Sequence, residues 1–109
     1  MFLADIHSNK EKVVDAKELL DNYISLARHD KDKILCLIVG YGSKTNKHKI
    51  KTAILEKLEE YYLAKKIKGY IIGNELDIFN EIYQKLYNNH RIPDSEKREK
   101  NPGKVYIIL

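Results

Sequence analysis

The sequence contains few of the residues that mark specialised classes of protein. Its 109 residues include one cysteine, no tryptophan and two prolines. With no second cysteine, Cys36 has no partner for a disulfide or a thiolate metal site, so we interpret it as a small buried residue in a reducing, cytoplasmic compartment. No apolar run approaches the roughly 18 residues of a membrane span, and residues 1–12 lack the basic start and long apolar middle that a signal peptide would have. We therefore expect a cytoplasmic protein that does not cross a membrane.

The overall composition is that of an ordinary folded protein. Hydrophobic residues make up 43% and charged residues 33% of the chain, and this length fits one domain over residues 1–109. Twenty Lys and Arg against 16 Asp and Glu give a net charge of +4. This balance favours anionic partners, and the placement of the cations matters more than their total.

Apolar runs alternate with segments of helical periodicity. Strands are expected over residues 2–6, 33–40, 65–73 and 104–109, and helices over 8–28, 45–64 and 74–89. Ile34 to Val39 is apolar throughout, which is typical of a central, usually parallel strand. Residues 90–103 carry both prolines and read as a surface loop. The order predicts an α/β two-layer sandwich with a βαβαβ core, in which residues 74–102 are an inserted helix and charged loop before the last strand.

Glycines and lysines gather where the central strand passes into the second helix. They are Gly40, Gly42, Lys44, Lys47, Lys49 and Lys51, with Tyr41, Ser43 and His48 among them. Carboxyl ends of parallel strands meet the N-termini of the following helices, where free N–H groups and the helix dipole attract anions. We interpret the group as a phosphate site, with Tyr41 placed to stack on an unpaired base. The alternative is that the glycines only form the turn, the lysines only solvate the helix and Tyr41 folds back on the protein.

Two further polar residues end the first strand. Asp5 and His7 are two positions apart, so on a strand their side chains project from the same face. A carboxylate and an imidazole beside a phosphate site are groups that activate water, protonate a leaving oxygen or hold a divalent cation. The alternative roles are a capping or turn carboxylate for Asp5 and a partly exposed packing residue for His7.

Together these motifs resemble the Smr (small MutS-related) domain. "ADIH" (residues 4–7) is similar to that family's Leu-Asp-x-His motif, "VGYG" (39–42) to its His-Gly-x-Gly motif, and "GKVYIIL" (103–109) to its final strand. The resemblance covers residues 1–73 and 103–109. It implies a compact α/β sandwich that binds DNA or RNA and, in many members, nicks or cleaves it. Asp5 and His7 would then be the functional pair, and Gly40 and Gly42 the backbone cradle.

Val39 departs from that pattern, because it replaces the histidine of the second motif and can neither transfer a proton nor bind a metal. His48, farther along the chain, is the candidate substitute. We therefore expect a nucleic-acid-binding endonuclease or nickase, with Mg²⁺ or Mn²⁺ as the divalent cation if one is used. One alternative is a non-catalytic nucleic-acid-binding module. Another is a protein-interaction domain that uses the inserted helix.

Overall fold

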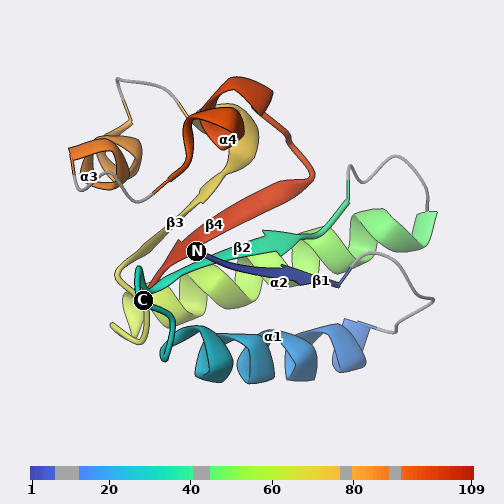
Figure 1. The fold of residues 1–109 in the computed structure, drawn as a ribbon. Coiled ribbons are helices and arrows are strands. Elements are labelled where there is room, and N and C mark those ends of the chain that lie inside the picture. The colour runs from blue at the N-terminus through green and yellow to red at the C-terminus, as the bar shows by residue number, and fades with distance from the viewer. Residues whose placement is uncertain (7–12, 41–44, 77–79, 89–91) are drawn as a thin grey trace.

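Strand β2 (Ile34–Ile38) lies inside a four-stranded sheet, as its uninterrupted apolar sequence predicts. The computed structural model describes residues 1–6, 13–40, 45–76, 80–88 and 92–109 (Figure 1). β2 pairs in parallel with β1 (Phe2–Asp5) and antiparallel with β4 (Lys104–Ile108). β3 (Gly69–Ile72) completes the order β1-β2-β4-β3 and is antiparallel to β4. The chain is thus an α/β domain with a mixed sheet.

Helices α1 (Val13–Ala27) and α2 (Thr45–Leu63) pack on one face of the sheet. The apolar stripes expected for both helices supply buried residues to a first core cluster. It includes Ala16, Leu20, Ile24, Leu35, Leu37, Val39, Ile50, Ile54, Leu58, Val105 and Ile107. Because strand side chains alternate between faces, every second residue of β2 and β4 belongs to this cluster. The predicted α/β fold class is confirmed, and α1, α2 and the sheet form the two layers expected from the sequence.

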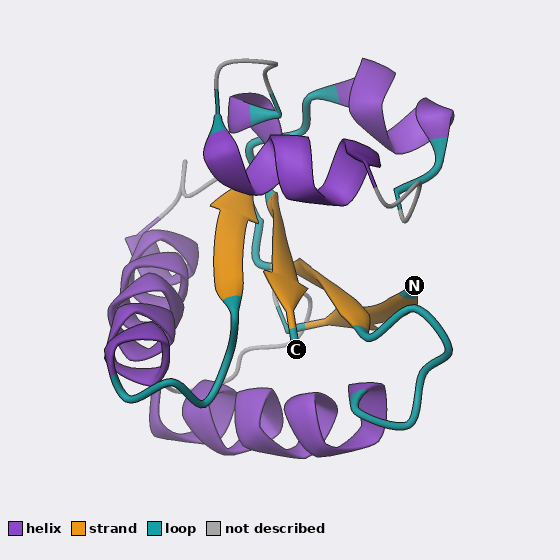
Figure 2. Cartoon of the chain, turned by 90° about the vertical axis from the view of Figure 1, so that its left-hand side faces the viewer, coloured by secondary structure: helices purple, strands orange, loops and turns teal. Residues whose placement is uncertain are grey.

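The opposite face of the sheet carries a second core cluster, and Figure 2 shows helices on this side of the strands as well. The strands contribute Ile34, Cys36, Ile71, Tyr106 and Ile108, and the chain between β3 and β4 contributes Leu76, Tyr83 and Ile92. Cys36 is a buried free thiol, as the sequence indicates. Burial raises the pKa of this thiol to about 12, so it is not a reactive thiolate at neutral pH.

The helix expected over residues 74–89 is two shorter elements in the described part of the chain. Residues Gly73–Glu75 form the 3₁₀ helix η1, and α3 spans Glu81–Asn88. The side-chain oxygen of Asn80 accepts hydrogen bonds from the amides of Ile82 (2.9 Å) and Tyr83 (3.2 Å). This is an N-cap, and it fixes where α3 begins.

The prediction of a surface loop over residues 90–103 is wrong, because Asp94–Glu99 form helix α4. Ile92, just before α4, is only 3% exposed and belongs to the second core cluster. The described residues of the segment 74–102 therefore cover one face of the sheet and contribute to the core. None of the helices among the described residues is long and apolar enough to cross a membrane.

Candidate functional site

Three strands end at the same edge of the sheet. Since β4 is antiparallel to both β2 and β3, and β1 is parallel to β2, strands β1, β2 and β3 all point one way. We call the place where they end the carboxyl edge. It consists of residues 5–6, 39–40 and 72–73, together with residues 101–104 at the start of β4. In α/β sheets this is the edge at which ligands collect.

Gly40 makes the sharp turn at the end of β2. Its φ of 80° lies in the left-handed region, which a glycine adopts without steric cost. The carbonyl oxygen of Gly103 accepts hydrogen bonds from the amides of Val39 (2.8 Å) and Gly40 (3.2 Å). A Cβ atom on Gly103 would lie 3.1 Å from the carbonyl carbon of Gly40, so the two backbones pass in close contact. The Gly40 amide is thus bound within the protein, and any anion cradle depends on the residues that follow it.

Asp5 lies at the carboxyl edge, as predicted. Asp5 of β1 pairs with Ile38 of β2, and Ile38 pairs with Lys104 of β4. These three residues form one row on the face of the second core cluster, with the backbones of Asp5 and Lys104 about 10 Å apart at ordinary strand spacing. Asp5 is exposed and Ile38 half-buried. The first motif and the start of the second are therefore neighbours in space.

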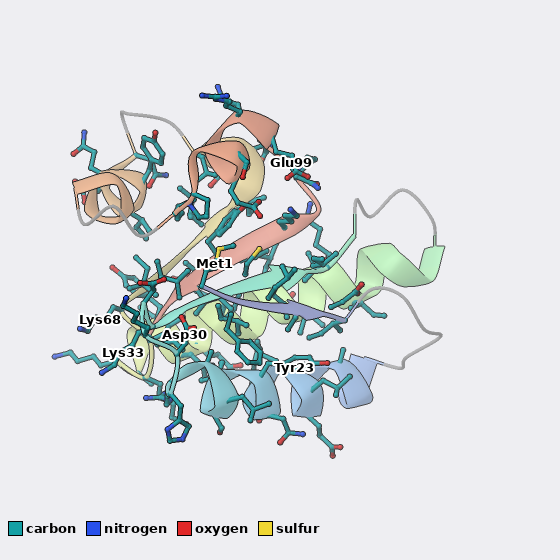
Figure 3. All side chains as sticks on the ribbon, viewed as in Figure 1. Met1, Tyr23, Asp30, Lys33, Lys68 and Glu99 are labelled. Atoms are coloured by element: carbon teal, nitrogen blue, oxygen red, sulfur yellow. The ribbon has the colours of Figure 1, made fainter. Side chains whose placement is uncertain are left out.

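Lys104 anchors a polar cluster beside this row. Its ammonium lies 3.0 Å from a carboxylate oxygen of Glu96 and 2.9 Å from one of Glu99. Glu96 also accepts a 2.7 Å hydrogen bond from the hydroxyl of Tyr106, which is fully buried. Burial by itself would lower the pKa of the Lys104 ammonium. The hydrogen bonds to the two carboxylates have the larger combined effect, so this pKa is raised above its ordinary value. In Figure 3, Glu99 lies near the beginning of β4.

The start of α2 meets the same edge. Lys51 donates a 2.9 Å hydrogen bond from its ammonium to the carbonyl oxygen of Pro102, just before β4. One of the four lysines expected around the phosphate site is therefore bound to the chain that enters β4. Lys47 and His48 belong to the first turns of α2, where the structure describes the backbone and not these side chains.

The remaining predicted site residues lie outside the described part of the chain. They are His7, Tyr41, Gly42, Ser43 and Lys44. Among the residues that the structure does describe, no three His, Cys, Asp or Glu side chains form a group that could hold a metal ion.

The sequence interpretation missed Glu96 and its bonds to Tyr106 and Lys104, because the segment around it reads as a solvated loop of mixed charge. One signal was present. Pro93 followed by Asp94, Ser95 and Glu96 is a typical helix start, with acidic residues in the first turn. This pattern predicts where α4 begins, but it does not predict which sheet residues α4 contacts.

Comparison of the chain with protein-family models, with curated proteins and with solved structures finds no match.

Proposed function

We propose that this chain is a cytoplasmic nucleic-acid-binding domain of Smr-like architecture. Its carboxyl edge contacts the phosphate backbone of DNA or RNA and hydrolyses a phosphodiester bond. Asp5 and His7 act on the reacting water and leaving oxygen, with a divalent cation such as Mg²⁺ or Mn²⁺ as the cofactor to be tested.

The observation that carries the proposal is the meeting of Asp5, the Gly40 turn and the start of α2 at one edge. A helix N-terminus and the lysines near it attract phosphate, and a carboxylate within the same edge supplies a base or a metal ligand. Lys51 supports the arrangement, since its hydrogen bond to Pro102 ties α2 to the loop that packs on Gly40.

A non-catalytic binding module on the same fold is the second candidate. It is favoured by Val39, which is buried in the first core cluster and offers no proton-transferring group. The third candidate, a protein-interaction domain built on the inserted helix, loses its motivation over the described part of α3. Tyr83 is buried there against the sheet, and Ile82 is partly buried beside it.

The test is cleavage of supercoiled plasmid and of structured RNA, with and without Mg²⁺ or Mn²⁺. Asp5→Asn keeps the shape of the side chain and removes its charge, so cleavage should fall a hundredfold or more, by the usual size of acid–base catalysis. Binding should survive. Glu18→Gln, at an exposed position of α1, is the matched control and should cleave like the wild type. Binding without cleavage by the wild type would select the non-catalytic module, and no binding at all would overturn the proposal.

A further inference from the structure

Six exposed cations lie at the end of the molecule opposite the carboxyl edge. They occur in two turns, one between α1 and β2 and one between α2 and β3, and we call them the basic turn surface: Arg28, Lys31, Lys33, Lys65, Lys66 and Lys68. The sequence interpretation centred the positive charge on the start of α2 and did not connect these two segments. Figure 3 shows Lys33 and Lys68 at the same end of the sheet.

Hydrogen bonds hold the two turns side by side. The Arg28 guanidinium donates to the carbonyl oxygen of Lys66 at 3.0 Å, directly from the first turn to the second. The end of β4 lies between them, since Leu109 donates to the Lys33 carbonyl (3.0 Å) and Lys68 to the Ile108 carbonyl (2.8 Å). The cations therefore form one surface.

Carboxylates within the two turns offset little of this charge. Asp30 and Asp32, in the first turn, are paired with the Met1 ammonium at 3.2 and 2.9 Å. In the second turn, residues 64–68 contain three lysines and no acidic residue. The surface is therefore positive, and a polyanion is the partner that its charge fits.

A surface hollow of about 510 Å³ opens beside the second turn, lined by Tyr62, Leu63, Lys65, Ile67 and Lys68. This volume is in the range of small-molecule sites. The Tyr62 side chain is 44% exposed, and its ring is held edge-on to that of Tyr70, with 6.4 Å between ring centroids. An oriented aromatic ring next to two lysines is the combination that binds a base and its phosphates.

We infer that single-stranded nucleic acid binds the basic turn surface, with an unpaired base stacked on Tyr62 in the hollow and its phosphates beside Lys65 and Lys68. This inference rests on the proposed function and adds a second contact region at the opposite end of the domain. A planar anionic membrane fits less well. The neighbouring outer face of α2 exposes Glu56, Glu59 and Glu60, and a plane laid on this end of the domain would meet all three. Of the three, only Glu59 lines a hollow with Tyr62, on the side of the ring that faces Tyr70.

The first test measures binding of fluorescent oligouridine and oligothymidine of 12 residues by fluorescence anisotropy, with a 12-base-pair duplex for comparison. Tyr62→Ala should weaken single-strand binding about ten- to a hundredfold, the usual effect of losing one stacked base. Tyr62→Phe keeps the ring and should bind within about twofold of the wild type on the same grounds. Duplex binding, which offers no unpaired base, should respond to neither substitution.

The second test compares two double variants that lower the net charge equally. Lys31→Gln with Lys68→Gln removes charge from the basic turn surface, whereas Lys17→Gln with Arg98→Gln removes it from α1 and α4. The first pair should reduce the log–log salt slope of single-strand binding by about 1.4, at about 0.7 per phosphate. The second pair should leave the slope unchanged.

The outcomes separate this inference from the proposed function. Wild-type binding that neither Tyr62→Ala nor the Lys31 and Lys68 pair alters overturns the inference and leaves the carboxyl edge as the interface. Equal loss in both double variants also overturns it, because the attraction is then diffuse. A wild-type protein that binds neither oligonucleotide nor duplex overturns both proposals. If that protein then sediments with phosphatidylserine vesicles, the basic turn surface is a membrane surface instead.

Discussion

Val39 is a residue whose surroundings explain its identity. It follows β2 and is fully buried in the first core cluster, on the face that α1 and α2 cover. Its amide is also bound, since it donates to the Gly103 carbonyl at 2.8 Å. A side chain at this position points into the core, away from the row that holds Asp5. A valine fits there, and a histidine would need a polar partner.

Replacing Val39 by His should therefore destabilise the fold, by about 1–3 kcal/mol for an unsatisfied buried polar group. Val39→Ala, which only removes methyl groups, is the control for lost packing. Urea unfolding of both variants, monitored by circular dichroism, measures the free energies. A Val39→His protein as stable as the wild type would show that the new side chain leaves the core, and its cleavage rate would then be the next measurement.

Glu96 contributes to stability through two hydrogen bonds at a half-buried position. It accepts from the Tyr106 hydroxyl and from the Lys104 ammonium. Glu96→Gln should lower the free energy of unfolding by about 1–3 kcal/mol, the usual cost of impairing a hydrogen-bonded charged group. Glu99→Gln is the matched control, because Glu99 bonds the same lysine from an exposed position and should change little. Equal urea midpoints for the two variants would contradict this assignment.

Single residues were predictable where one local property decides their role. Cys36 sits in an apolar run and is buried, and Gly40 follows a strand and makes a turn. Glu96 was not, because its partner Tyr106 lies on a strand and no sequence pattern pairs the two. The wider site is only partly placed, since Asp5 and Gly40 are described and His7 is not.

Among the elements, α4 changes the expected effect of a deletion. A charged surface loop could be removed without loss of the fold, but residues 91–100 include buried Ile92 and the Glu96 carboxylate that bonds Tyr106. Replacing these residues by a short Gly-Ser bridge should broaden or abolish the thermal unfolding transition, because the second core cluster is opened. Arg98→Ala, at an exposed position of the same helix, is the control. A sharp transition in the deletion variant would show that these residues do not organise the core.

The start of α2 yields a prediction about binding. If Lys44 and Lys47 contact phosphates at the carboxyl edge, their joint replacement by Ala should reduce the salt slope for duplex DNA by about 1.8, at about 0.9 per phosphate. Lys17→Ala with Arg98→Ala lowers the net charge equally at positions on α1 and α4, outside the start of α2, and should leave the slope unchanged. An unaltered slope in the α2 variant would place the duplex elsewhere on the surface.

Elements with a strong apolar pattern were predictable, and those held by polar contacts were not. β2 is apolar throughout, and α1 and α2 each have an apolar stripe that matches their buried face. In contrast, α4 contacts the sheet through Glu96, which accepts hydrogen bonds from Lys104 and Tyr106 of β4. Charge and hydrogen bonding here replace apolar contact. Periodicity measures hydrophobicity, so it does not detect such a helix.

For the whole molecule, the alternation of strands and helices correctly predicts an α/β domain, in which Asp5 and Gly40 lie at one edge of the sheet. It does not predict that β4 inserts between β2 and β3 as an antiparallel strand. The closing sequence "VYIIL" is apolar at every position, as β2 is, and its residues are all buried. That similarity is the sequence signal for a second central strand, because both faces of this sheet are covered.

The last prediction concerns the response of the whole fold to alkaline pH. Burial raises the pKa of Tyr61 to about 12, with a further contribution from its hydrogen bond to Asp21. The pKa of Tyr70 is raised to about 12 by burial and by the hydrogen bond from its hydroxyl to Glu59. The pKa of the Cys36 thiol is also raised to about 12, mainly by burial. Each group therefore retains its proton to a higher pH in the folded chain than in the unfolded chain.

The direction in which stability changes with pH follows from the number of protons that each state binds. Above the unfolded pKa values, 9.0 for Cys36 and 10.0 for the tyrosines, the unfolded chain binds fewer protons than the folded chain, so stability falls as pH rises. Lys104, whose pKa is also raised, adds a contribution of the same sign that is lost as pH rises through its folded value. The Met1 ammonium adds an earlier loss above pH 8.0, because burial lowers its pKa and hydrogen bonds to Asp32 and Asp30 outweigh that effect and raise it. The urea midpoint should therefore begin to fall above about pH 8 and decline further between about pH 9 and 12. Tyr61→Phe removes one titrating group and should flatten that decline, whereas an unchanged midpoint up to pH 11 in the wild type would show that these side chains titrate as they do in the unfolded chain.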